Sequence, residues 1–405
     1  MSKTQWLNNK YKNIVNYDLL NERYNVGLQK FDLHMEQMNN CEPYQYPGCE
    51  DGKYKKSSSL YDLNNWMTSF VTGLAPLYYK STKNEKYLKW ANGFGKYYHS
   101  KMFDTPMDSM HDIGFLYSPY SVAMYKLTGD EVHKKDALKA ADELAKRFSI
   151  TGGYIDAWER MDNEERPGRA IIDCMMNIPL LLWAWKETGH PFYRDIALSH
   201  AELTKKLFIR DDFSVVHSFI FDKKTGEVIG EANKCGFDNG SWWARGTAWA
   251  VYGFAILARY MDSDEYRKLA TNIAKAYISQ FPENSFVPIW DFRLPEDLPA
   301  KKCGNVPADW DETRRENCEF NVDTSAAAIM ACGLMCLYRQ TDEEWMLKFA
   351  IESIEELSAD KYINCKTDVL GILSHQNGQM HYTTYGDYFF IEALSMILYN
   401  EDGCW

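Results

Sequence analysis

One short element recurs five times along the chain, and it constrains the fold more than any other feature. Each copy contains the end of an apolar helix, a short polar turn with Thr or Gly in most copies, and a new helix that opens with acidic and aromatic residues. The copies span residues 79–91, 125–137, 185–197, 258–270 and 338–350. Because Thr, Ser and Asp commonly cap helices, each copy predicts two helices joined by a tight turn.

The two helices of each pair differ in how their apolar residues are distributed. The helix before the turn is apolar or small on nearly every face, as in "CMMNIPLLLWAW", whereas the helix after it is amphipathic, as in "DEVHKKDALKAADELAKRF". All-round apolarity indicates a buried helix, and a one-sided stripe indicates an outer layer. Five such pairs, a helix near 5–36 and a final helix from Gly386 make about twelve helices. We therefore expect residues 1–405 to form a single all-α domain, an (α/α)6 barrel, with an open solenoid as the alternative.

In such a ring, the long connections that precede the inner helices share one end, because the short turns lie at the other. These connections carry the unusual polar and aromatic residues of the chain: Trp66, His111, Asp112, Trp158, Asp173, His217, Arg245 and the segment 385–387. Several inner-helix N-termini also meet there, and their partial positive charge favours anions. We expect the functional site at this end, and we expect it to accept an acidic small molecule.

Charge and cysteine usage exclude several classes of protein. The net charge of −12 argues against nucleic acid and anionic membranes as partners. Residues 1–20 lack an apolar signal core, no segment resembles a membrane span, and the ten cysteines form no CxxC pair. We expect a cytoplasmic monomer or homodimer. We expect no metal and no cofactor, because the sequence contains no metal-ligand spacing, phosphate loop or nucleophile elbow.

Two aspartates are the first candidates for chemistry. Asp112 in "MHDIGFLY" and Asp173 in "IIDCMMN" occupy equivalent positions at the starts of inner helices. Two carboxyl groups that face each other in a buried site raise the pKa of at least one of them, which suits proton transfer near neutral pH. The alternative is that each aspartate only caps its helix. Pro179 favours a helix that begins after Asp173, because proline suits only the first turn.

Other candidates each have a structural alternative. His111 and His217 are either substrate contacts or hydrogen-bonded core residues. Arg245 begins a buried helix, where it needs either an anionic ligand or a protein acid as its partner. The aromatic candidates either stack on sugar rings or fill the core; they are Trp66, Trp158, Trp243 and Trp249.

Seven motifs resemble, in order and in spacing, those of the unsaturated glucuronyl hydrolases of glycoside hydrolase family 88. They are "NWMTSF", "MHDIGFLY", "GGYIDAWER", "IIDCMMNIPLL", "VVHSF", "SWWARGTAW" and "GDYFFIEAL", and they cover roughly residues 60–400. "HDIGF" together with "IIDCMMN" is a specific pair. The fold alone is a weak signal, because unrelated sugar enzymes share it.

The resemblance implies a glycosidase that removes the 4,5-unsaturated uronic acid left by polysaccharide lyases at the non-reducing end of a glycosaminoglycan-type oligosaccharide. Asp173 matches the catalytic aspartate, which protonates C4 of the vinyl ether and activates the water that adds at C5. The resulting hemiketal opens and expels the remaining sugars. Asp112 matches a second aspartate that holds ring hydroxyls, and we expect it to be ionised beside a protonated Asp173. The residues that match the substrate pocket are Trp66, His111, Trp158, His217, Trp243, Arg245 and Trp249.

Three positions depart from the family pattern. Thr68 stands where an aspartate is usual, and Lys234 and Cys235 stand where His-Gln is expected. The C-terminal loop "SHQNGQMHYTTYGDYFF" also differs from loops associated with sulfate recognition. These changes leave the reaction type in place and the substrate preference open. Lys234 is a candidate to meet a carboxylate or a sulfate, or is simply solvated.

Three other functions compete with this interpretation. A hydrolase of unsaturated galacturonyl-rhamnose from pectin shares the fold and a comparable aspartate, but "IIDCMMN" favours the glucuronyl type. A sugar 2-epimerase needs a pair of catalytic histidines, for which no motif is present. A non-catalytic sugar-binding scaffold conflicts with the joint presence of Asp112, Asp173, His217 and Arg245.

Overall fold

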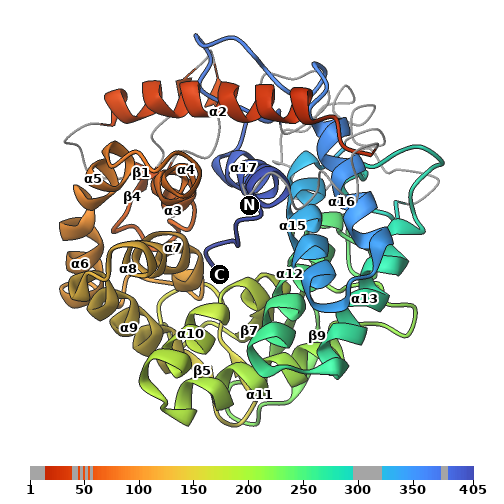
Figure 1. The fold of residues 1–405 in the computed structure, drawn as a ribbon. Coiled ribbons are helices and arrows are strands. Elements are labelled where there is room, and N and C mark those ends of the chain that lie inside the picture. The colour runs from red at the N-terminus through yellow and green to blue at the C-terminus, as the bar shows by residue number, and fades with distance from the viewer. Residues whose placement is uncertain are drawn as a thin grey trace.

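The computed structural model describes residues 14–38, 58–294, 322–374 and 382–405, and the backbone of three short strands between 44 and 54. Within these residues, helices alternate between an inner and an outer ring (Figure 1). The inner positions are α3 (Thr68–Thr72) with α4 (Leu74–Thr82), α7 (Ile113–Tyr117) with the π-helical turn η1 (Ser118–Val122) and α8 (Ala123–Thr128), α10 (Pro179–Thr188), α12 (Ala244–Met261), α15 (Thr324–Thr341) and α17 (Thr384–Tyr399). The outer positions are α2 (Tyr17–Gln37), α5 (Lys86–Asn92) with α6 (Gly95–Phe103), α9 (Glu131–Lys146), α11 (Pro191–Leu207), α13 (Asp264–Ile278) and α16 (Glu344–Leu357).

The inner helices close into a ring. Each packs against the next, from α3 through α7, α10, α12 and α15 to α17, and α17 packs back against α3 and α4. The prediction of an (α/α)6 barrel is therefore confirmed, and the open solenoid is wrong. The N-terminal helix expected near 5–36 is α2, and residues 1–13 lie outside the described part of the chain.

The repeated turns follow one design that the sequence predicted only in part. The inner helices end in residues with a left-handed backbone: Lys83, Gly129, Gly189, Asp262, Asp342 and Asn400. Asp130 and Ser263 cap the following outer helices, as expected. The threonines act differently. The hydroxyl of Thr128, for example, donates to Met124 O (2.7 Å) and accepts from Asp130 N (3.1 Å), which closes the end of the inner helix.

A small antiparallel sheet, which the all-α prediction did not include, lies beside the starts of the inner helices. It has the order β7 (Gly168–Ile171), β8 (Ser218–Phe221) and β9 (Val228–Glu231). Shorter pairs join β5 (Phe148–Ser149) to β6 (Tyr154–Ile155), β1 (Tyr44–Gln45) to β4 (Ser58–Ser59) and β2 (Cys49–Glu50) to β3 (Lys53–Tyr54). Ile171 pairs with Ser218, and Ile172 N donates to His217 O (3.0 Å). The sheet therefore brings residue 173 beside residue 217.

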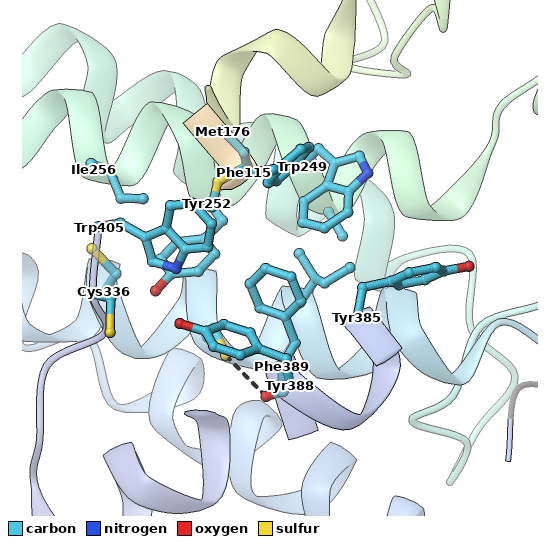
Figure 2. Packing of buried hydrophobic residues seen from close by; sticks show 14 of the residues in the cluster. Phe115, Met176, Trp249, Tyr252, Ile256, Cys336, Tyr385, Tyr388, Phe389 and Trp405 are labelled. Carbon is cyan, nitrogen blue, oxygen red and sulfur yellow. Dashed lines mark hydrogen bonds between the residues drawn. The ribbon is translucent and has the colours of Figure 1, made fainter. Parts of the chain in front are cut away.

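The core fills the centre of the ring with aromatic side chains and with the last residues of the chain. Figure 2 shows Phe115, Trp249, Phe389 and Trp405 packed together, and the rings of Phe389 and Trp405 are stacked with centroids 5.9 Å apart. The Trp405 indole donates to the buried carboxylate of Glu392 at 3.1 Å. Among the described residues, no helix combines the length and the apolar character needed to cross a membrane.

Candidate active site

Asp112 and Asp173 lie on segments that touch each other. Asp112 is the residue before α7, and Asp173 lies in the 3-10 turn η2 (Ile172–Met176) between β7 and α10. Neither side chain caps a helix, so the capping interpretation is wrong for both. Asn177 joins the two segments, because its Nδ2 donates to Asp112 Oδ1 (3.4 Å) and to Asp173 O (3.3 Å), while its Oδ1 accepts from Phe115 N (2.8 Å).

Glycine at 114 permits this close approach. A Cβ atom at this position would lie 2.4 Å from the Cα of Asn177 and 2.5 Å from its carbonyl oxygen. Both atoms are backbone, so a larger side chain would push the two segments apart. The glycine in "HDIGF" therefore sets the spacing between the two aspartate-bearing segments.

Burial raises the pKa of both carboxyl groups, but to different extents. Burial, together with the nearby charge of Asp173, raises the pKa of Asp112 to about 8 against the opposing effects of Asn177 and Arg147. Burial raises the pKa of Asp173 to about 6, opposed by a bond from its own backbone N–H and by the charge of Arg245. The Oδ2 atom of Asp173 is buried without a hydrogen-bond partner.

The expectation of an ionised Asp112 beside a protonated Asp173 is therefore wrong for the free protein. Asp112 is only 7% exposed, whereas Asp173 is partly exposed, so the loss of water falls more heavily on Asp112. At neutral pH Asp112 keeps its proton and Asp173 is mostly ionised. Both groups nevertheless titrate close enough to neutrality for proton transfer.

Two buried histidines flank the pair in the neutral form with a defined tautomer. His111 Nδ1 accepts from Trp158 N (3.3 Å), and His217 Nδ1 accepts from Lys234 N (3.0 Å). Each imidazole therefore carries its proton on Nε2, an assignment that follows from the hydrogen-bond network. Burial lowers the pKa of His111 well below its usual value and that of His217 to about 3. His111 Nε2 lies 3.4 Å from Asp112 Oδ1 but forms no hydrogen bond with it.

Two buried arginines, which sequence reasoning did not select, hold the loop that carries Trp158. Arg147 donates to the carbonyl oxygens of residues 156–159 at 2.6–3.1 Å, and Arg166 donates to those of 157 and 158 at 3.1 Å. The loop is unusual, because Trp158 has a φ of +36° and Glu159 a φ of +56°. Non-glycine residues seldom adopt this conformation without support from their surroundings. The arginines supply that support and fix the position of the indole.

Arg245 has a protein acid as its partner. Its guanidinium forms an ion pair with Asp323, which also caps α15 by accepting from Ala326 N (2.9 Å). Of the two interpretations left open by the sequence, the ion pair describes the free protein. The guanidinium also lies over the rings of Trp243 (4.9 Å) and Tyr385 (5.4 Å). Its charge lowers the pKa of Asp173 against the effect of burial, so it acts at the candidate catalytic group.

Aromatic rings connect the inner-helix starts around these groups. Trp66 stacks on Tyr385 with centroids 5.2 Å apart, the His217 ring lies 5.2 Å from Trp243, and Trp158 lies 6.2 Å from His217. Trp249 differs from the other aromatic candidates. It is 1% exposed and packs against Phe115 and Phe389, so the core-packing interpretation describes its position (Figure 2).

The three departures from the family pattern have different environments. Thr68 is buried and donates to Asn65 Oδ1 (2.9 Å), which stabilises the turn before α3. Lys234 is exposed, and its Nζ lies 4.7 Å from the centre of the Trp158 ring. Cys235 is partly buried, forms no disulfide and lies close enough to Arg245 to influence its pKa, after burial, Asp323 and Tyr385. The C-terminal loop lies partly outside the described residues, since 375–381 are not included.

Three further residues belong to this site by position: Arg147, Arg169 and Asn177. Tyr385 lies in the segment 385–387, which the sequence pattern already placed at this end of the ring. Asn177 had a signal in the sequence, because it follows Asp173 at the spacing of one helical turn. Within the described part of the chain, no group of three or more His, Cys, Asp or Glu residues is arranged to hold a metal ion.

Comparisons with known proteins give the same family as the motifs. The model of Glycosyl Hydrolase Family 88 matches residues 34–282. The unsaturated glucuronyl hydrolase of Bacillus sp. (strain GL1) is 32% identical over 375 residues, which cover 89% of this chain and 93% of that protein. The unsaturated chondroitin disaccharide hydrolase of Streptococcus pyogenes serotype M1 is 29% identical over 389 residues, which cover 93% of this chain and 90% of that protein.

The fold agrees with these matches. The crystal structure of the Bacillus sp. GL1 unsaturated glucuronyl hydrolase superimposes with a TM-score of 0.79 at 30% identity, over 93% of this chain and 96% of that one. The ring of helices, the motifs and the paired aspartates thus lead to one conclusion: the chain belongs to glycosyl hydrolase family 88.

Proposed function

We propose that this protein is a hydrolase that releases the 4,5-unsaturated uronic acid from the non-reducing end of lyase-generated, glycosaminoglycan-type oligosaccharides. The observation that carries the proposal is the joining of Asp112 and Asp173 through Asn177, with both carboxyl pKa values raised, in a chain of family 88. The relatives named above are hydrolases of unsaturated uronyl sugars, which supports the same substrate class here.

Asp173 is the proposed general acid and base. The substrate excludes water as it binds, and its own carboxylate brings a negative charge, so both effects raise the pKa of Asp173 further. The protonated carboxyl group then transfers its proton to C4, and the C4–C5 double bond becomes an oxocarbenium-like cation at C5. The Asp173 carboxylate produced by this step stabilises the cation, takes a proton from the attacking water and so completes the hydration. Opening of the hemiketal breaks the C5–O5 ring bond, which gives a ketone at C5 and leaves C1 as a hemiacetal. Collapse of this hemiacetal to an aldehyde breaks the glycosidic bond and releases the remaining sugar as an alcohol.

Asp112 has a different proposed task. Because burial raises its pKa to about 8, it is protonated at neutral pH and donates a hydrogen bond to a ring hydroxyl. Asn177 donates to Oδ1 of this carboxyl group, and His111 Nε2 lies 3.4 Å from the same oxygen. The neutral Nε2–H of His217 is a second donor for the sugar, and Trp66, Trp158 and Trp243 offer aromatic faces. The Arg245–Asp323 pair holds its charge beside Asp173.

The experiment follows the ultraviolet absorbance of the conjugated double bond in lyase-generated disaccharides. The native protein should remove the absorbance, and Asp173→Asn should leave it unchanged while keeping the native circular dichroism spectrum. Asp195→Asn, which changes an exposed aspartate of α11, is the matched control and should retain full activity. Binding of the disaccharides without loss of absorbance would refute the proposal.

We also infer that the chain forms one catalytic domain and works in the cytoplasm. Among the described residues, one large hydrophobic cluster includes residues from Val15 to Trp405, which supports one domain. Cys174, Cys332 and Cys336 are buried free thiols, which is typical of a reducing compartment. The expectation of a monomer or homodimer stays a prediction.

A further inference from the structure

Arg147 joins two segments of the site that are distant in the sequence. It follows the last turn of α9, and only 2% of its surface is exposed. Its guanidinium donates to Ser109 O (2.9 Å), shortly before Asp112, and to the carbonyl oxygens of residues 156–159 (2.6–3.1 Å), in the loop that carries Trp158. One side chain therefore holds the aspartate-bearing segment and the tryptophan loop together.

The same two segments are joined a second time through His111. Its Nδ1 accepts from Trp158 N (3.3 Å), so the orientation of the imidazole depends on where the loop places that N–H group. The backbone of Arg147 also holds the loop, because its carbonyl oxygen accepts from Asp156 N (2.8 Å). A shift of the loop would therefore move the indole and the histidine next to Asp112 at the same time.

Carbonyl dipoles, rather than a carboxylate, hold the charge of Arg147. Asp156, the acid of the same loop, forms its ion pair with Arg166 (2.7 Å), and among the described residues Arg147 has no ion pair of its own. Burial lowers its pKa to about 10, so it stays charged at neutral pH. Together with burial its charge lowers the pKa of His111, and it lowers that of Asp112 against burial. Because apolar side chains often replace buried charged groups without loss of stability, the fold alone is a weak reason for an arginine here.

We propose that Arg147 is a positioning residue for the reaction, which sets the spacing between the His111–Asp112 segment and the Trp158 ring. The inference rests on the proposed function and adds to it a residue that touches no substrate. Without the bonds from Arg147, the loop would leave the rare backbone conformation of Trp158 (φ +36°) and Glu159 (φ +56°). A displacement of about 1 Å at a reacting centre can cost about a hundredfold in rate.

The test compares Arg147→Ala and Arg147→Lys with Lys146→Ala. Lys146 is the matched control, because it precedes Arg147 on α9 and its side chain is 61% exposed. Far-ultraviolet circular dichroism gives the folded fraction, and the ultraviolet assay gives kcat and KM for each folded molecule. Loss of the loop position should raise KM, and loss of the Asp112 position should lower kcat.

We expect kcat/KM to fall about a hundredfold in Arg147→Ala and about tenfold in Arg147→Lys, and to stay native in Lys146→Ala. A lysine keeps the charge but has its donors at one point, so it cannot span carbonyl oxygens on two segments. A residue that only stabilised the fold would leave kcat and KM of the folded molecules unchanged.

Chemical rescue adds a second measurement on Arg147→Ala. Guanidinium chloride at about 50 mM should raise its kcat/KM at least about tenfold, because the ion restores the planar donor fork, whereas methylammonium chloride at the same concentration should not. Neither salt should change the rate of the native protein by more than the same concentration of sodium chloride does. If Arg147→Ala does not fold, kcat and KM of Arg147→Lys decide.

Three results would overturn the proposal: folded variants with native kcat and KM, an Arg147→Ala protein that guanidinium does not rescue better than methylammonium, or failure of both variants to fold, which would make the role of Arg147 structural. A native protein that consumes no unsaturated disaccharide would instead refute the proposed function.

Discussion

The pH dependence of the reaction identifies which carboxyl group gives the proton. The profile of kcat/KM against pH reports the pKa values of the free enzyme. If Asp173 is the acid, its pKa of about 6 places the descending limb there. The protonated fraction then falls to about one tenth at pH 7 and about one hundredth at pH 8, as expected for titration of a single group. Activity should fall nearly tenfold per pH unit above 6.

The alternative gives a different curve from the same structure. If Asp112 were the acid, its pKa of about 8 would keep most molecules protonated at pH 7, and the limb would begin two units higher. The assay is the loss of ultraviolet absorbance at substrate concentrations well below KM, between pH 4.5 and 9. A plateau that extends to pH 8 would refute the assignment of Asp173.

Loss of folded protein must be separated from this effect. Glu392 is fully buried in the core, and burial raises its pKa to about 7, so its ionisation weakens the fold over part of the same range. Far-ultraviolet circular dichroism at each pH measures the folded fraction, and the rates are divided by it. A limb near pH 6 that survives this correction belongs to the site.

Three further predictions concern how the ring holds the site. Gly114→Ala should lower the free energy of unfolding by about 1–3 kcal/mol and reduce activity, because the new methyl group overlaps the backbone of Asn177; Gly230→Ala, where a Cβ atom meets nothing within 4 Å, should have little effect in the same thermal unfolding assay. Glu392→Gln should leave stability unchanged below pH 4.5, where the native carboxyl group is neutral in both states, and raise it by about 3 kcal/mol above pH 7, where the native fold must bury an ionised group; denaturant titrations at both pH values would detect an effect of the opposite sign. Trp405→Ala should cost about 3–5 kcal/mol by opening a cavity beside Phe389, and an unchanged melting temperature would show that the terminal residues do not support the core.

The sequence by itself determined the architecture, because its signals are local. Burial of every face of one helix and a single apolar stripe on the next can be read from neighbouring residues, and so can the turn between them. The same local signals located the two aspartates at the starts of inner helices, in motifs specific enough to indicate the family. What they missed locally was small: the role of Thr128 at a helix end, and the short sheet, whose strands of four residues lack a clear alternating pattern.

Only the tertiary structure decided which groups meet and therefore how they titrate. Asn177 bonds Asp112 across 65 positions of sequence, and Arg245 meets Asp323 across 78. The pKa of Asp112 is higher than that of Asp173, which is the reverse of the expected order. The order depends on how much water each carboxyl group loses in the folded ring. The bonds from Arg147 to Ser109 and to the Trp158 loop depend in the same way on segments that meet only in the folded chain. Desolvation and Coulomb interactions act through space, so a linear pattern can name the reacting residues but cannot assign their charges.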